Sequence, residues 1–232
     1  MEKSSIDIFD KNFKEISDKI AVAAKKSGRC PQDIILLAAT KTVDVEVINH
    51  AIKSGIKFIG ENRVQEFLSK YENYEPVHKH FIGHLQTNKV KQIVPFVHMI
   101  HSVDSMRLLE TINREAEKIA RRVKVLLEVH VAKEETKSGF TPDEINQFII
   151  HNSKFIIDYP WVEICGVMGM ATNTDDEKEW RRCFREISSL ASKLSTLNTK
   201  QVSMGMSDDY LIAIQEGSTM IRIGSTIFGS RL

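Results

Sequence analysis

The chain has 232 residues, 42% of them hydrophobic, which is enough to bury one large core. Its 32 lysines and arginines nearly balance its 31 aspartates and glutamates, leaving a formal net charge of +1. This balance argues against binding to nucleic acid or to an anionic membrane through a global electrostatic field.

Short apolar runs alternate with amphipathic runs from one end of the chain to the other. No linker rich in glycine, serine or proline interrupts them, so we expect residues 1–232 to form a single domain. The apolar runs predict eight strands. In chain order these are Ile34–Ala39, Lys57–Ile59, His80–Ile82, His98–Ser102, Val123–Val131, Val162–Val167, Gln201–Met204 and Met220–Ile223.

The segments between the strands repeat apolar residues every three or four positions, as amphipathic helices do. Two helix starts carry a threonine three residues before a glutamate, Thr141 with Glu144 and Thr174 with Glu177. This spacing is typical of a capping box, in which the two side chains satisfy free backbone N–H groups. The clearest apolar stripes are Phe9, Phe13, Ile16 and Ile20; Leu109, Ile112, Ala116 and Ile119; and Trp180, Cys183, Phe184, Ile187 and Leu190.

Strands separated by helices must be parallel, which leaves an open doubly wound sheet or a closed barrel. The first strand ends in Ala39-Thr40-Lys41, without the glycine-rich phosphate loop that usually follows the first strand of an open sheet. Eight strand–helix repeats favour the barrel. The predicted fold class is therefore α/β, a single (β/α)8 TIM-type barrel.

The active site of such a barrel lies at the carboxyl ends of its strands, so the polar residues after each apolar run are the candidates. Lys41 follows the first run, where an apolar barrel mouth would favour the free amine that Schiff-base formation requires. The alternative is a lysine that starts a loop and reaches water. The other candidates are Gly60–Arg63, Gly83–Gln86, Ser102–Asp104, Met168, Ser203–Asp209 and Gly224–Ser225.

Two loops near the end of the chain are candidates for a phosphate site. Ser207 precedes an apolar helical stretch and is predicted to cap it, which would turn free N–H groups toward an anion. Gly224 and Ser225 follow the eighth strand, and the loops after strands seven and eight are the usual phosphate site of this fold. The alternatives are an ordinary cap and an ordinary turn.

Arg222 lies on the last predicted strand, on the same face as Met220. Because both faces of a barrel strand are covered, its guanidinium needs a partner. That partner is either a carboxylate such as Glu163 or the ring nitrogen of a bound pyridine cofactor.

Cysteine and histidine spacing argues against disulfides and metal sites. Cys30, Cys165 and Cys183 form no CxxC pair, which suits a reducing compartment. The pairs His78-x-His80 and His98-x-x-His101 lack a third ligand at the spacing of a zinc site. Without a signal peptide or an apolar run of membrane-spanning length, the protein is expected to be cytoplasmic.

Longer motifs surround the candidate residues. They are Leu36–Lys41, Gly60–Glu66, His80–Lys89, His101–Ser105, Lys137–Gly139, Ser203–Asp209 and Gly217–Gly224. Together they are highly specific, and the resemblance that they carry covers nearly the whole chain. The chain resembles the YggS/PROSC family of pyridoxal phosphate homeostasis proteins, relatives of the N-terminal barrel of alanine racemase.

The resemblance implies that the cofactor is pyridoxal 5'-phosphate (PLP), held as a Schiff base on Lys41. It also implies that Arg222 faces the pyridine nitrogen. His130 and Tyr210 depart from the family pattern, where Asn and Met are more usual. The remaining residues that it implies are Ser203, Ser207, Gly224 and Ser225 around the phosphate, and Asn62 and His84 along the ring.

The expected function is PLP homeostasis, in which the protein buffers or transfers PLP without catalytic turnover. An arginine beside the pyridine nitrogen favours its unprotonated form and weakens the ring as an electron sink. Alanine racemase adds a tyrosine base from a second domain, whereas here Gly229–Leu232 follows the last strand almost at once. The expected protein is a monomer, with apo PLP-dependent enzymes as candidate recipients.

Two alternatives remain open from the sequence. One is a single-domain PLP-dependent amino-acid racemase or lyase. The other is a phosphosugar-binding barrel enzyme that forms its own Schiff base on Lys41 without a cofactor.

Overall fold

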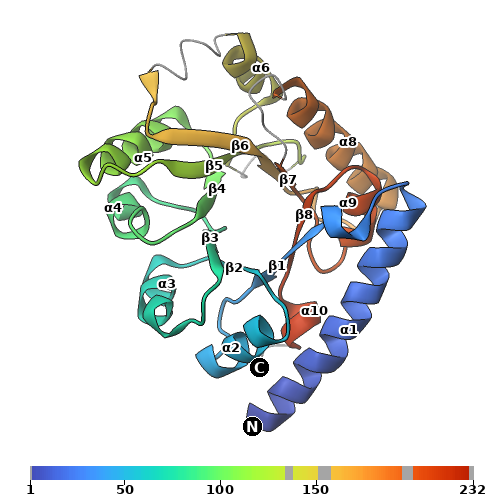
Figure 1. The fold of residues 1–232 in the computed structure, drawn as a ribbon. Coiled ribbons are helices and arrows are strands. Elements are labelled where there is room, and N and C mark those ends of the chain that lie inside the picture. The colour runs from blue at the N-terminus through green and yellow to red at the C-terminus, as the bar shows by residue number, and fades with distance from the viewer. Residues whose placement is uncertain (1, 134–137, 151–157, 195–200, 230–232) are drawn as a thin grey trace.

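Eight parallel strands close into a barrel in the order β1 to β8, and β8 pairs with β1 (Figure 1). The computed structural model describes residues 2–133, 138–150, 158–194 and 201–229. Lys137 and residues 230–232, which the sequence analysis singled out, lie outside these ranges.

The predicted barrel is confirmed, and each predicted strand lies within two residues of its observed ends. Parallel pairing follows from the connections, because every strand returns through a crossover on the outside of the barrel. The strands are β1 (Ile35–Ala39), β2 (Phe58–Glu61), β3 (His78–Phe81), β4 (Met99–Val103), β5 (Val123–Val129), β6 (Val162–Gly169), β7 (Gln201–Ser203) and β8 (Met220–Ile223).

Helices surround the barrel, and α1 runs along its outside beside α2, α9 and α10 (Figure 1). Its apolar stripe packs inward, with Phe9, Ile16 and Ile20 all buried. The helices described are α1 (Glu2–Lys26), α2 (Val45–Lys53), α3 (Val64–Lys70), α4 (Val90–Ile93), α5 (Met106–Lys118), α6 (Pro142–Ile150), α8 (Glu177–Leu194), α9 (Tyr210–Gln215) and α10 (Ser225–Phe228).

One of the two predicted capping boxes forms. The backbone N–H of Thr141 donates to the Glu144 carboxylate at 2.8 Å, and the N–H of Glu144 donates to Thr141 Oγ1 at 3.3 Å. The second prediction was wrong, because α8 begins at Glu177 itself. There the Asp176 carboxylate accepts from the N–H of Lys178 at 2.9 Å and so caps one of the free N–H groups of the first turn.

Alternation along the strands separates an outer core from a polar barrel interior. Ala38, Ile59 and Ile221 face the surrounding helices, in a core shared with α1 and α2. The inward positions of the strands instead include buried polar side chains. These are His80, His101, Glu128, Ser203 and Arg222.

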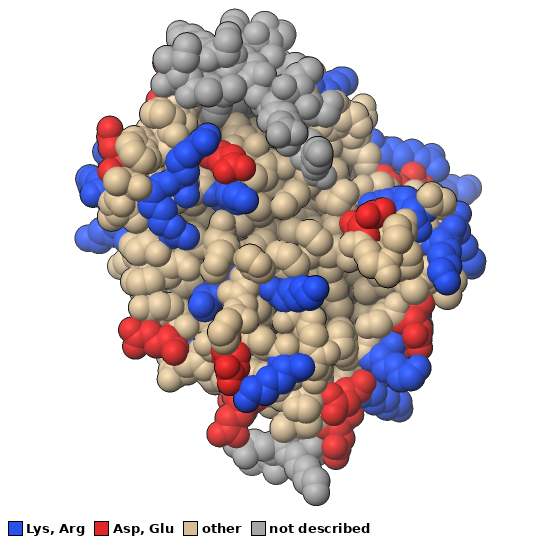
Figure 2. Space-filling view, viewed as in Figure 1, with Lys and Arg blue, Asp and Glu red and all other residues tan. Residues whose placement is uncertain are grey.

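The outer surface mixes both signs of charge, and acidic and basic side chains are interspersed on the face shown in Figure 2. No helix within the described ranges has the length and apolar content needed to cross a membrane.

Candidate functional site

Lys41 lies two residues after the end of β1, at the carboxyl mouth of the barrel, where its side chain is half-buried. Side chains alternate between the two faces of a strand, and Ala38 of β1 packs in the outer core, so its neighbour Leu37 points into the barrel. There the Leu37 side chain lies against Gly60 of the adjacent strand β2, where a Cβ would contact its Cδ2 atom. Continuing that alternation beyond Ala39 predicts that Lys41 lies on the inner side. The next residue, Thr42, has a φ of 61°, which turns the chain sharply into the loop.

Hydrogen bonds from the outer layer fix the backbone on both sides of Lys41. Before it, Thr40 Oγ1 donates to the Glu61 carboxylate at 2.6 Å. After it, the N–H of Thr42 donates to the carboxylate of Glu66. Lys70 joins the two sides, because its ammonium contacts Glu66 Oε1 at 2.6 Å and the Thr40 carbonyl at 3.3 Å.

Glu61 is the most buried carboxylate of this network, with 1% of its surface exposed. Burial raises its pKa above the ordinary value, against the opposing effects of Thr40 and Lys70. Tyr74 also donates to its Oε1 atom, at 3.1 Å, whereas Oε2 has no hydrogen-bond partner among the described residues.

Arg222 is buried inside the barrel and is held by oxygen atoms of β6 and β7. Its Nη1 donates to both the carbonyl and the hydroxyl oxygen of Ser203 at 2.8 Å, and its Nη2 donates to the Gly169 carbonyl at 3.2 Å. A guanidinium has five N–H groups. These three bonds leave two N–H groups available to a ligand, counting contacts to the residues described.

The suggested ion pair between Arg222 and Glu163 was wrong. Glu163 pairs in register with Lys124 near the amino end of β6, whereas Arg222 binds Gly169 at the carboxyl end. Burial lowers the pKa of Arg222 to about 10, while the charges of Asp209 and Glu128 oppose that shift.

Glu128 lies inside the barrel, where it was not anticipated as a site residue. Burial, helped by the charge of Asp104, raises its pKa to about 7, although Arg222 acts in the opposite direction. A sequence signal was present, because Glu128 interrupts the apolar run of β5 at an inward position.

Ser207 and Ser225 meet at the carboxyl ends of β7 and β8, with their hydroxyl oxygens 3.2 Å apart. The prediction that Ser207 caps the following helix was wrong, because Ser207 is itself the first residue of a three-residue turn, Ser207–Asp209, and α9 begins only at Tyr210. Asp209 closes this turn by accepting from the N–H of Met206 at 2.6 Å. The Ser207 hydroxyl, bonded to Ser225 alone among the described residues, is therefore not used in capping.

Asn62 and His84 follow the neighbouring strands β2 and β3. A Cβ on Gly83 would overlap the backbone carbonyl of Asn62, so glycine allows these two loops to pack closely. The His84 side chain is 64% exposed and lies 3.2 Å from a carboxylate oxygen of Asp104. In this conformation His84 turns toward the loop after β4.

Comparisons with known proteins agree with this architecture. The family described as alanine racemase, N-terminal domain, matches residues 17–232. The chain is similar to the pyridoxal phosphate homeostasis protein of Aquifex aeolicus, with 38% identity over 221 residues that cover 93% of this chain and 95% of that protein.

Two solved structures resemble it over all or nearly all of their length. An unknown protein from Bifidobacterium adolescentis is 32% identical, with a TM-score of 0.88, covering 98% of this chain and 97% of that one. PipY of Synechococcus elongatus, with PLP bound, is 29% identical, with a TM-score of 0.78, covering 92% of this chain and 100% of that one.

Proposed function

The chain belongs to the alanine racemase N-terminal domain family, in the YggS/PROSC group of pyridoxal phosphate homeostasis proteins, and from this premise we propose that it binds PLP covalently on Lys41. The observation that carries the proposal is a set of three elements at one barrel mouth. Lys41 supplies an amine, Arg222 keeps two N–H groups available, and the Ser207–Ser225 pair offers hydroxyls for a phosphate.

These residues fit PLP part by part. When bound, PLP supplies an aldehyde, whose carbon forms a C=N bond with the Lys41 nitrogen as water is released. Arg222 donates a hydrogen bond toward the pyridine nitrogen, while Ser207, Ser225 and the backbone at Gly224 bind the phosphate. Asn62 borders the ring. PipY, with PLP bound, supports this assignment by similarity.

We further propose that the protein buffers or transfers PLP without turnover. With its pKa at about 10, Arg222 stays charged near neutral pH and acts only as a donor. A pyridine nitrogen that accepts from such a donor stays unprotonated, which weakens the ring as an electron sink. This suits a carrier, because an amino acid that reacts with the bound PLP is not activated for further chemistry.

One observation favours a second candidate function, a PLP-dependent racemase or lyase. Glu128 lies inside the barrel with a pKa raised to about 7, a value suited to a general base. Incubating the loaded protein with a panel of amino acids separates the two functions. If the protein is an enzyme, the wild type should racemise or eliminate an amino acid, and Glu128→Gln should abolish that turnover while PLP stays bound. If it is a carrier, no turnover should be seen.

Peptide mapping tests the covalent link. After incubation with PLP and reduction with borohydride, the peptide containing Lys41 should carry the added mass of the reduced cofactor. Lys89 is also half-buried and follows β3, so it serves as an internal comparison. Labelling at Lys89 and not at Lys41 would contradict the proposal.

The proposed carrier is a monomer that works in the cytoplasm, forms one domain over residues 1–232 and delivers PLP to apo PLP-dependent enzymes. All three cysteines are free, which supports a reducing compartment.

A further inference from the structure

A chain of hydrogen-bonded side chains crosses the barrel interior behind Arg222. His80 on β3 and His101 on β4 share a hydrogen bond of 2.8 Å between Nδ1 and Nε2. His101 Nδ1 then lies 3.2 Å from Ser203 Oγ on β7. Since Arg222 Nη1 contacts the same oxygen at 2.8 Å, four side chains from four strands form one continuous relay.

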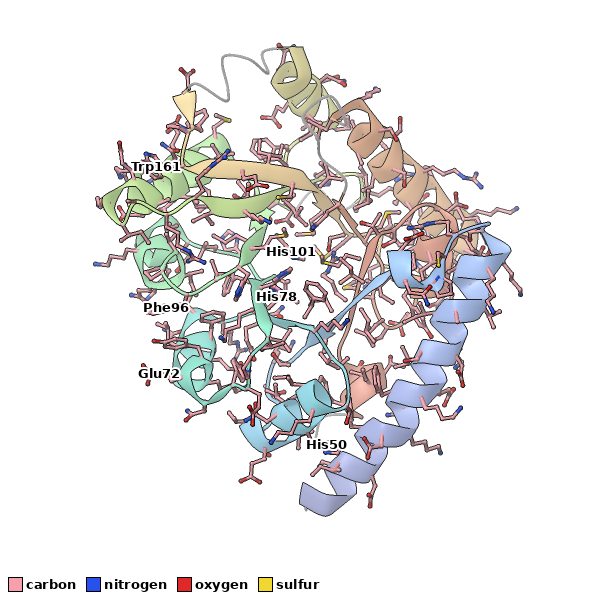
Figure 3. All side chains as sticks on the ribbon, viewed as in Figure 1. His50, Glu72, His78, Phe96, His101 and Trp161 are labelled. Carbon is pink, nitrogen blue, oxygen red and sulfur yellow. The ribbon has the colours of Figure 1, made fainter. Side chains whose placement is uncertain are left out.

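The relay is dry. His101 and Ser203 are fully buried, and Figure 3 shows His101 inside the ring of strands. Burial lowers the pKa of His80 to about 3 and that of His101 well below its ordinary value, helped at His101 by electrostatic interactions with His80 and Arg222. Both rings are therefore neutral, and each carries one N–H.

The direction of the hydrogen bonds follows from donor counting. Arg222 can only donate, so Ser203 Oγ accepts from it and must send its own hydrogen elsewhere. The acceptor is His101 Nδ1, which must therefore carry no hydrogen of its own. His101 then carries its hydrogen on Nε2 and donates to His80 Nδ1.

The opposite direction leaves a group unsatisfied. If His101 Nδ1 carried the hydrogen, Ser203 Oγ would accept from both His101 and Arg222. The buried Ser203 hydroxyl hydrogen would then lack an acceptor among the described residues, which is costly in a dry interior.

We propose that His101 and Ser203 are positioning residues for Arg222, with His80 accepting the Nε2 hydrogen of His101. The relay orients the Ser203 hydroxyl so that its lone pairs face Nη1 of Arg222. Both Nη1 hydrogens are then bonded to Ser203, one to its carbonyl and one to its hydroxyl oxygen. This fixes the guanidinium with its remaining N–H groups toward the cofactor. The proposal rests on the proposed function, because the group that Arg222 meets is the pyridine nitrogen of PLP. His101 itself touches no part of the cofactor.

The first test needs no cofactor. Nitrogen NMR of the side chains in PLP-free protein should show His101 protonated on Nε2 and unprotonated on Nδ1. A hydrogen on Nδ1 would overturn the relay whether or not the protein binds PLP.

The second test follows the ring nitrogen of PLP carrying nitrogen-15. His101→Leu removes the acceptor for Ser203, so the ring nitrogen signal should shift and the dissociation constant for PLP should rise about tenfold, the size of one hydrogen bond. His101→Asn keeps an acceptor near the place of Nδ1 and should restore both readouts. His78→Leu, at an exposed ring on β3, should change neither.

A ring nitrogen signal and an affinity unchanged in His101→Leu would overturn the proposal. If that variant does not fold, Ser203→Ala removes the same link with a smaller change in volume and must show the same shift. If the wild type binds no PLP, the proposed function fails, while the tautomer measurement still decides the relay.

Discussion

Thr40 Oγ1 lies 2.6 Å from Glu61 Oε1, a hydrogen bond that ties the end of β1 to the end of β2 one residue before Lys41. Both side chains are buried, so no water replaces this bond when it is broken. The position of the lysine therefore depends on a carboxylate that lies outside the barrel interior.

Thr40→Val should lower the free energy of unfolding by about 1–3 kcal/mol, because the buried Glu61 carboxylate loses a donor. Urea unfolding measures the change, and Thr40→Ser, which keeps the hydroxyl, should lose less. Equal stability of the valine variant and the wild type would show that this bond contributes nothing.

Glu128 should make the protein less stable as the pH rises. Its pKa is about 7 in the folded state against an ordinary value of 4.5, so the unfolded chain releases this proton at lower pH. Stability conferred by the protonated form is therefore present below about pH 4.5 and falls as the pH rises toward about 7, by up to roughly 3 kcal/mol.

Glu128→Gln should remove this part of the pH dependence. Urea unfolding at about pH 5 and about pH 8 measures it, with the exposed Glu117→Gln as a matched control that keeps the wild-type slope. A wild-type slope in Glu128→Gln would contradict the buried-carboxylate account.

Ser207→Ala should weaken PLP binding by about 1 kcal/mol or more, the scale of a lost hydrogen bond to a charged group. Pyridoxal lacks the phosphate, so its affinity should not change. Ser69→Ala, at an exposed serine on α3, is the control for PLP. Equal loss for PLP and pyridoxal would place Ser207 away from the phosphate.

The sequence predicted the barrel well because its signals are local. Apolar runs set the strands, and period-2 alternation correctly put Met220 and Arg222 on one buried face. Lys41 was also correctly placed at a strand end, since its position follows from the end of the run before it.

The partners of these residues were less predictable because they depend on register between distant strands. Glu163 lies six residues before Gly169 on β6, about 20 Å along the strand, and this separates it from the oxygen that Arg222 binds. The His101–Ser203 contact joins residues 102 positions apart. Ser207 was misassigned as a cap because the turn closed by Asp209 delays the helix.

The central claim is that the Lys41 amine carries PLP, and the absorbance spectrum of the PLP-treated protein beside Lys41→Ala tests it most directly. The wild type should be yellow, with an imine band that borohydride removes, and Lys41→Ala should be colourless. A wild type that stays colourless with added PLP, or a Lys41→Ala variant with the same band, would contradict the account.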